Sequence, residues 1–231
     1  MLESIAFIPD GNRRYAKKEG ISLEESYKKG VNNFWSVLEW LSNYPSIKSC
    51  TFYAFSLKNF ERSKNELSIL MRIFEDELIK AVNTEFDSNK KISVKFIGRV
   101  ELFSSKLREE MKLLEEKTSV YSDRVVYLAL GYDGQSEIID ASKKFARDVL
   151  EGVISIDSLT PQSFSKYLYS DAKFPDLIVR TSNEHRLSGF LTYQSSYSEL
   201  AFLNKFWPEV SKDDIDRIVK DFEERERRFG K

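Results

Sequence analysis

Short apolar runs alternate with longer helical stretches along the whole chain, and this alternation restricts the fold more than any other feature of the sequence. Six runs are typical of buried strands, at residues 5–8, 50–55, 92–97, 124–130, 176–180 and 200–203. Amphipathic segments lie between them and predict helices, at residues 15–18, 22–42, 63–86, 104–118 and 136–150, with two more starting at 160 and 211. Such alternation predicts an α/β fold with a mostly parallel sheet of about six strands, flanked by helices.

No repeat, linker or change of composition divides the chain, so we expect a single domain over residues 1–231. The one cysteine, Cys50, excludes an intramolecular disulfide framework and a cysteine-rich metal site. The N-terminus enters a strand directly, without the pattern of a signal peptide, and no run approaches 18 apolar residues. These features lead us to expect a cytoplasmic protein.

The turn after the first strand is the strongest candidate for a binding site. Residues 9–12 read Pro-Asp-Gly-Asn, and Arg13 and Arg14 open the next helix. A strand, a tight turn and a helix start together present backbone N–H groups to a phosphate. Asp10 would repel a bare anion, but it suits a divalent cation that lies between the acid and a phosphate. The alternative is an ordinary turn in which a side chain caps the helix.

Polar clusters also follow the second and fifth strands, at residues 56–62 and 180–188. Ligands of open parallel sheets bind beyond the carboxyl ends of the strands, so the three clusters are expected at one edge. The net charge of −1 gives no general attraction for anions, and binding must therefore rest on local groups. The arginines available are Arg13, Arg14, Arg62, Arg180 and Arg186. Arginines converging with one acid predict a polyphosphate ligand with Mg²⁺, although helix caps or surface ion pairs would explain any one of them alone.

Five segments in order carry a resemblance to a known family. They are residues 10–18, 53–63, 178–188, 190–194 and 199–208, which include Asp-Gly-Asn-Arg-Arg, Asn-Phe-x-Arg-Ser and Val-Arg-Thr-Ser. They resemble the signature regions of the cis-prenyltransferases, which include the undecaprenyl and dehydrodolichyl diphosphate synthases. The segment at 59–63 and Arg13 are most similar to the dolichol-type and archaeal branch.

The resemblance implies an enzyme that condenses isopentenyl diphosphate units onto an allylic diphosphate of farnesyl or geranylgeranyl type, with Mg²⁺. The product would be a polyprenyl diphosphate used as a lipid carrier for glycan assembly. An apolar tunnel between sheet and helices would hold it, and the faces of helices 22–42 and 63–86 with strand 50–55 are the candidates. Such faces can equally be plain core.

The resemblance also implies roles for particular residues. Asp10 would hold Mg²⁺, and Glu199 matches a second residue implicated in metal binding. The allylic diphosphate would be bound by Gly11, Asn12, Arg13, Arg14 and Arg62. The isopentenyl diphosphate would be bound by Arg180, Arg186, Ser188 and Arg228. Asp10, Asn12, Ser56 and Asn59 would be catalytic, the last three by orienting substrate and moving the proton, and Glu66 matches a carboxylate on a flexible helix.

The family's C-terminal Arg-x-Gly, here residues 228–230, crosses between subunits, so a homodimer is implied. Nucleic acid is not an expected partner, because Glu223, Glu224 and Glu226 interrupt the basic C-terminal helix. Peripheral contact with a membrane would suit release of a lipid product.

The chain departs from the family in the segment after the first motif. Leu23 and Tyr27 stand where bacterial members carry an arginine and a histidine that touch the allylic diphosphate. Arg13, Lys17 or Lys28 would have to substitute for them. His185, the single histidine, is either a loop residue or a group near the metal.

Three other functions remain alternatives. One is a non-catalytic partner subunit, against which the retained Asp10 and Arg228 speak. Another is an irregular or short-chain prenyl diphosphate synthase, which the changes at Leu23 and Tyr27 keep open. A generic dinucleotide-binding protein is disfavoured, because no Gly-x-Gly-x-x-Gly follows the first strand.

Overall fold

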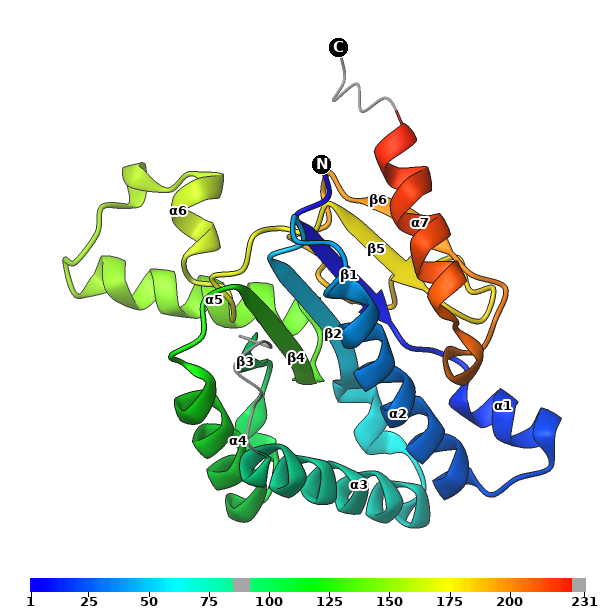
Figure 1. Ribbon diagram of the computed structural model, residues 1–231. Coiled ribbons are helices and arrows are strands. Elements are labelled where there is room, and N and C mark those ends of the chain that lie inside the picture. Colours follow the sequence, from blue (N-terminus) through cyan, green and yellow to red (C-terminus); the bar gives the residue numbers. More distant parts are fainter. Residues whose placement is uncertain (85–91, 226–231) are drawn as a thin grey trace.

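A parallel sheet forms the centre of the computed structural model, which describes residues 1–84 and 92–225 (Figure 1). The strand order is β3-β4-β2-β1-β5-β6, and every neighbouring pair is parallel. The strands are β1 (Ser4–Ile8), β2 (Ser49–Ser56), β3 (Ile92–Ile97), β4 (Arg124–Tyr132), β5 (Leu177–Arg180) and β6 (Glu199–Phe202). The α/β prediction with about six strands is confirmed.

Helices cover both faces of this sheet (Figure 1). They are α1 (Asn12–Glu19), α2 (Leu23–Leu41), α3 (Lys64–Asn83), α4 (Ser105–Thr118), α5 (Gly134–Leu150), α6 (Pro161–Ser165) and α7 (Lys212–Glu224). The helix expected over 63–86 is described only to Asn83, and its last two expected positions lie outside the described residues. No helix in the described part of the chain is long and apolar enough to cross a membrane.

Both faces of the central strands are buried, as parallel sheets require. Phe7 of β1 packs with Phe52 and Trp207 on the face that α2 and α7 cover. Its neighbours Ala6 and Ile8 point to the opposite face, because successive side chains of a strand alternate. This two-sided burial explains why the strands are nearly continuous apolar runs.

The connections place two loops side by side at the carboxyl edge of the sheet. From β1 the chain continues to β2 on one side, whereas β5 pairs with β1 on the other side. Ligands of α/β sheets bind at such a change of direction. The loop after β1 and the loop after β5 therefore meet in the position where a site is expected.

Several strand boundaries differ from the expectation by one or two residues. β2 includes Ser56 and β4 extends to Tyr132, since these two residues pair beyond an irregularity in the register. β6 runs over Glu199–Phe202, one residue earlier than the apolar pattern indicates. Pairing between strands continues past the point where local composition changes from apolar to polar.

Candidate active site

The loop after β1 is held by backbone and hydroxyl contacts to its neighbours. The Asp10 amide donates to Thr181 Oγ1 over 2.8 Å, and the same hydroxyl donates to the Asp10 carbonyl over 2.7 Å. The Trp207 amide donates to that carbonyl over 2.9 Å. Gly11 has a φ of +104°, and a Cβ there would lie 2.0 Å from Ser182 Oγ. The turn therefore requires glycine for both conformation and space.

Arg180 connects the two loops. Its guanidinium is buried and donates to Asp10 Oδ2 over 2.9 Å and to Ser188 Oγ over 2.7 Å. It also donates to the carbonyl of Arg186. The second Asp10 oxygen lies 3.4 Å from the guanidinium of Arg14. The structure thus brings together Asp10, Arg14, Arg180 and Ser188, as the sequence predicted.

A second carboxylate, Glu184, lies among the arginines. It accepts a hydrogen bond from Arg14 over 2.9 Å and another from Arg186. The Arg14 guanidinium also lies over the Phe206 ring, 5.7 Å from its centroid. Because Arg186 is 62% exposed, it can turn towards a ligand at low cost. Glu184 was not among the predicted site residues, although its place between Arg180 and Arg186 pointed to it.

Three buried polar atoms around these loops have no hydrogen-bond partner in the described structure. They are Asn12 Oδ1, Ser182 Oγ and Arg180 Nε. An unpaired buried polar atom costs about 1–3 kcal/mol. Such atoms are rare in folded proteins. Two of the three face glycines, because a Cβ at Gly11 would lie 2.0 Å from Ser182 Oγ and a Cβ at Gly30 would lie 2.4 Å from Asn12 Oδ1.

A further cluster lies at the end of β2 and the start of α3. The Tyr27 hydroxyl donates to Glu66 over 2.6 Å and accepts from Arg62 over 2.7 Å, and Arg62 also donates to Glu66 over 2.8 Å. Burial raises the pKa of the Tyr27 hydroxyl above its usual value, and the bond to Glu66 acts in the same direction. Arg13 lies 3.9 Å from Glu66. Leu23 packs against the nearby apolar cluster. Leu23 and Tyr27, which replace the arginine and histidine of bacterial members, therefore both have contacts within the protein.

Ser56 and Asn59 shape the turn between β2 and α3. The Ser56 amide donates to Asn59 Oδ1 over 3.0 Å, and the Ser56 side chain accepts from the Asn59 backbone. These reciprocal bonds form a capping box. Asn59 and Arg62 then line the same cavity as Asn12 and Tyr27.

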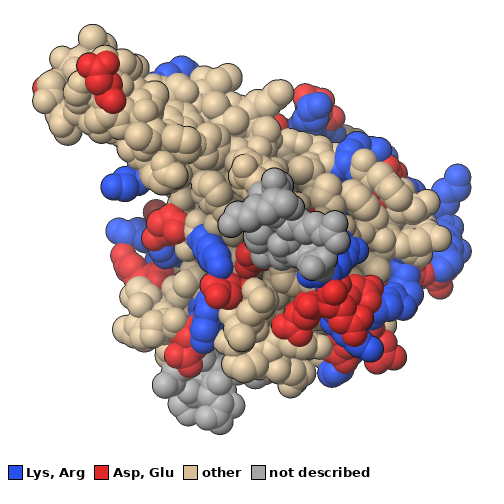
Figure 2. All heavy atoms as spheres, turned by 90° about the horizontal axis from the view of Figure 1, so that it is seen from above, with Lys and Arg blue, Asp and Glu red and all other residues tan. Residues whose placement is uncertain are grey.

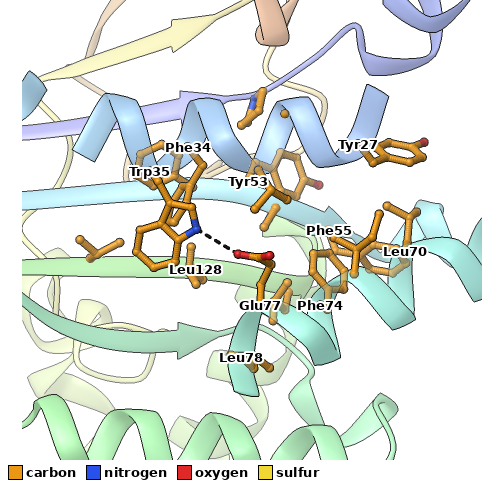
Figure 3. Close-up of a pocket in the computed structure, with 18 of the residues that line it drawn as sticks. Tyr27, Phe34, Trp35, Tyr53, Phe55, Leu70, Phe74, Glu77, Leu78 and Leu128 are labelled. Atoms are coloured by element: carbon orange, nitrogen blue, oxygen red, sulfur yellow. Dashed lines mark hydrogen bonds between the residues drawn. The ribbon is translucent and has the colours of Figure 1, made fainter. Parts of the chain in front are cut away.

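That cavity has a volume of about 260 Å³ and lies between the sheet and helices α2, α3 and α4 (Figure 3). Asn12, Tyr27, Asn59 and Arg62 line it at the carboxyl edge of the sheet. Aromatic and aliphatic side chains line most of the remainder, among them Phe34, Phe55, Leu70, Phe74 and Leu128. An apolar cavity therefore begins beside the arginine-rich loops.

Glu199 lies apart from this centre. Glu199 opens β6 opposite Leu177, which itself pairs with Ile5, so it sits at the amino edge of the sheet. Asp10 follows the carboxyl end of β1 at Ile8, which lies three residues beyond Ile5, about 10 Å further in the strand direction, and β5 separates β1 from β6. Within one chain a single ion cannot touch both carboxylates. His185 is exposed, stacks on Phe202 with 4.6 Å between ring centroids and contacts Asn183 Oδ1 at 3.0 Å.

Arg228, the remaining predicted site residue, lies outside the described residues.

Asp10 offers one carboxylate to a cation, and no group of three or more His, Cys, Asp or Glu side chains gathers in residues 1–84 and 92–225. Mg²⁺ usually binds one or two carboxylates and takes its other ligands from phosphate and water. Asp10 is partly exposed, with 32% of its side chain accessible, so its carboxylate can serve as that protein ligand.

Two arginine-containing loops meet at Arg180, with one acid between them and an apolar cavity beside them. This arrangement is the one expected for a protein that binds an anionic head group with an apolar tail. A sequence model described as putative undecaprenyl diphosphate synthase matches residues 8–230, and the chain belongs to that family. The predicted membership of the prenyl-transferring enzymes is thereby confirmed.

Individual relatives agree with this assignment. The chain is 44% identical to a tritrans,polycis-undecaprenyl-diphosphate synthase (geranylgeranyl-diphosphate specific) of Thermoplasma volcanium, covering 98% of this chain and 88% of that protein. It is 43% identical to a protein of the same name from Pyrobaculum aerophilum, covering 98% and 95%. Among solved structures, lavandulyl diphosphate synthase from Lavandula x intermedia in complex with dimethylallyl diphosphate matches with a TM-score of 0.94 and 31% identity. That match covers 100% of this chain and 98% of the other.

Proposed function

We propose that this protein is a Mg²⁺-dependent cis-prenyltransferase that elongates an allylic diphosphate with isopentenyl diphosphate. The observation that carries the proposal is the bridge from Asp10 through Arg180 to Ser188 beside an apolar cavity. Tyr53 belongs to β2 beside the cavity, and its side chain packs on the opposite face of the sheet, where the hydroxyl donates to the Tyr132 carbonyl over 3.2 Å and contacts the Ser188 carbonyl at 3.5 Å. A diphosphate can bind at the loops while its hydrocarbon enters the cavity.

The residues support the reaction by stabilising the leaving group. As the allylic C–O bond breaks, negative charge grows on the diphosphate, and donors already aimed at it stabilise the transition state more than the ground state. The amides around Gly11 and Asn12, with Arg13, Arg14 and Arg62, would supply these donors. Asp10 would hold Mg²⁺, whose charge would stabilise the same leaving group.

The second substrate would lie across the Asp10–Arg180 bridge. Arg180, Arg186 and Ser188 would bind isopentenyl diphosphate, with Arg186 released from Glu184. Its double bond attacks the allylic carbon, a C–C bond forms, and a proton leaves the isopentenyl unit to the released diphosphate or a nearby oxygen. Asn12, Ser56 and Asn59 would orient the groups that exchange this proton.

The archaeal relatives carry geranylgeranyl-diphosphate specificity in their names, and we propose the same starter here. The product would be a polyprenyl diphosphate that serves as a lipid carrier for glycan assembly. A second candidate is an irregular condensation of two allylic units, which the fold match to lavandulyl diphosphate synthase favours. Tyr27 and Leu23, at the altered positions beside Arg62, would then select the acceptor.

We also propose that the enzyme is a homodimer. Glu199 pairs with Arg225 over 3.0 Å at the amino edge of the sheet, so the chain leaves α7 towards Arg228 from a point far from its own Asp10. Both Glu199 and Arg228 would then serve the partner's site.

The projecting arm that carries α6 shows few charged side chains at the upper left of Figure 2. Exposed apolar residues on and near it are Leu150, Val153, Ile156, Leu159 and Phe174.

The proposed setting is the cytoplasm, with peripheral contact to a membrane during product release, because the product is apolar beyond its diphosphate.

The test is an incubation of purified protein with labelled isopentenyl diphosphate, Mg²⁺ and one starter per reaction: dimethylallyl, geranyl, farnesyl or geranylgeranyl diphosphate. We expect a long product with geranylgeranyl diphosphate, lost in Asp10→Ala and on chelation of Mg²⁺. Asp213→Ala, an exposed acid of α7, is the matched control and should be fully active. No elongation with any starter by folded protein would refute the proposal, and a product formed without isopentenyl diphosphate would favour the irregular reaction.

A further inference from the structure

Glu77 places a charge inside the apolar cavity. The cavity face of α3 consists of Leu70, Ile73, Phe74, Glu77, Leu78 and Ala81. These positions follow helical spacing, and an apolar residue would be expected at every one of them. Among the described residues that line the cavity, only Arg62 and Glu77 are charged. Arg62 belongs to the diphosphate end, so the mechanism does not account for Glu77.

The Glu77 carboxylate is held between two helices. Trp35 of α2 donates its indole N–H to Glu77 Oε2 over 3.1 Å, and Figure 3 shows the pair facing each other across the cavity wall. Lys80 donates to the other oxygen over 2.6 Å. The Glu77 side chain is 26% exposed, so the carboxylate retains some contact with water at the seam between α2 and α3.

The pair lies at the end of the cavity remote from the diphosphate loops, where Trp35 is 41% exposed. Glu66 marks the diphosphate end, where it contacts Arg62, and Glu77 is eleven residues further along α3. At a rise of 1.5 Å per residue, the two carboxylates are about 16 Å apart along the helix axis. A hydrocarbon anchored by its diphosphate at the loops would pass Leu70 and Phe74 before it reaches Glu77.

An apolar chain end that covers this carboxylate would remove its remaining water, and desolvating a charged group is unfavourable. The chain also has little other space, because the cavity of about 260 Å³ is smaller than the roughly 300–1,000 Å³ of most ligand sites. To grow past Glu77, the prenyl chain must either displace the Glu77 carboxylate or separate α2 from α3. The Trp35–Glu77 hydrogen bond opposes both changes.

We propose that the Trp35–Glu77 pair sets the product length, by placing a polar stop in the path of the growing chain. This inference rests on the proposed chain elongation.

The experiment measures the size distribution of products from the wild type, Glu77→Leu and Glu77→Gln, with geranylgeranyl diphosphate and excess isopentenyl diphosphate. Both variants remove the charge, and Gln keeps the size of the side chain. We expect products longer by one or more isoprene units, with the larger shift in Glu77→Leu, which also loses the hydrogen bond from Trp35.

The matched control is Glu24→Gln. Glu24 of α2 pairs with Arg72 of α3, so it joins the same two helices but does not line the cavity. Its product sizes should equal those of the wild type. An unchanged distribution in both Glu77 variants would overturn the inference, as would an equal shift in Glu24→Gln. A wild type that forms no product would instead refute the proposed function, and the inference with it.

Discussion

At the residue scale, the site depends on how close Gly11 comes to the loop after β5. Ser182 Oγ occupies the space where a side chain of residue 11 would start, and Phe206 lies on the same side. This contact keeps Asp10 beside Arg180, although the two are 170 positions apart in the sequence. The glycine therefore serves the contact between Asp10 and Arg180 as well as the turn.

Replacing Gly11 with alanine should damage stability and activity together. The positive φ and the clash with Ser182 should cost about 1–3 kcal/mol in the free energy of unfolding. Displacement of the Asp10 loop should lower elongation by on the order of 100-fold. Urea unfolding and product formation would measure the two effects.

Gly20→Ala is the control for that substitution. Gly20 also has a positive φ, +66°, but a Cβ at this position would meet no atom within 4 Å. The variant should lose stability through backbone strain while elongation stays near the wild-type rate. A Gly11→Ala variant as active as Gly20→Ala would show that the close approach is not needed.

At the element scale, the segment between β6 and α7 supports the loop that carries Asp10. The Ser182 amide donates to the Lys205 carbonyl over 2.7 Å, and the Trp207 amide binds the Asp10 carbonyl. Asp214, buried in the first turn of α7, accepts from Lys205 over 2.6 Å and from Ser211. The start of α7 is thereby tied to the loop after β5.

Asp214→Asn should weaken this attachment in a pH-dependent way. Burial raises the pKa of the Asp214 carboxyl, but hydrogen bonds from Lys205 and Ser211 outweigh burial and lower the pKa to about 2. The ordinary value is 3.8, so the ionised form stabilises the fold at pH values above it, by ~2 kcal/mol. That contribution is lost as the pH falls from about 4 towards about 2.

Urea unfolding of wild type and Asp214→Asn across roughly pH 2–7 would measure this contribution, as a difference that is constant near neutral pH and shrinks towards about pH 2. A difference that grew on acidification would contradict the assigned role of Asp214.

At the scale of the whole molecule, the placement of Glu199 and of the end of α7 predicts shared sites. Both lie at the amino edge of the sheet, whereas Asp10 lies beyond its carboxyl edge. In a symmetric dimer each surface is used twice, so a residue remote from its own site can complete the site of the partner.

Mixing Asp10→Ala with Arg228→Ala should therefore restore activity. In the proposed homodimer, each variant alone would lack a required group in both sites. A mixed dimer has one intact site, made from Asp10 of one subunit and Arg228 of the other. Product formation should appear after the two inactive proteins are unfolded together and refolded. Continued inactivity of verified mixed dimers would argue that Arg228 does not act across the interface.

The sequence alone determined the architecture and which side chains gather around Asp10. The alternation of apolar runs with amphipathic segments predicted a parallel sheet. Because ligands of such sheets bind beyond the carboxyl ends of the strands, Asp10, Arg14, Arg180 and Ser188 were expected at one edge. These predictions succeeded because they rest on local periodicity and on a property common to all parallel sheets.

Only the tertiary structure decided the contacts between distant segments. Tyr27 meets Glu66 across 39 positions and Trp35 meets Glu77 across 42, so neither pair has a local signal in the chain. Glu199 was predicted as a metal residue, yet the register of β6 puts it at the edge opposite Asp10. Strand register and helix packing set these distances, and both depend on the burial of whole faces rather than on the residues beside each group.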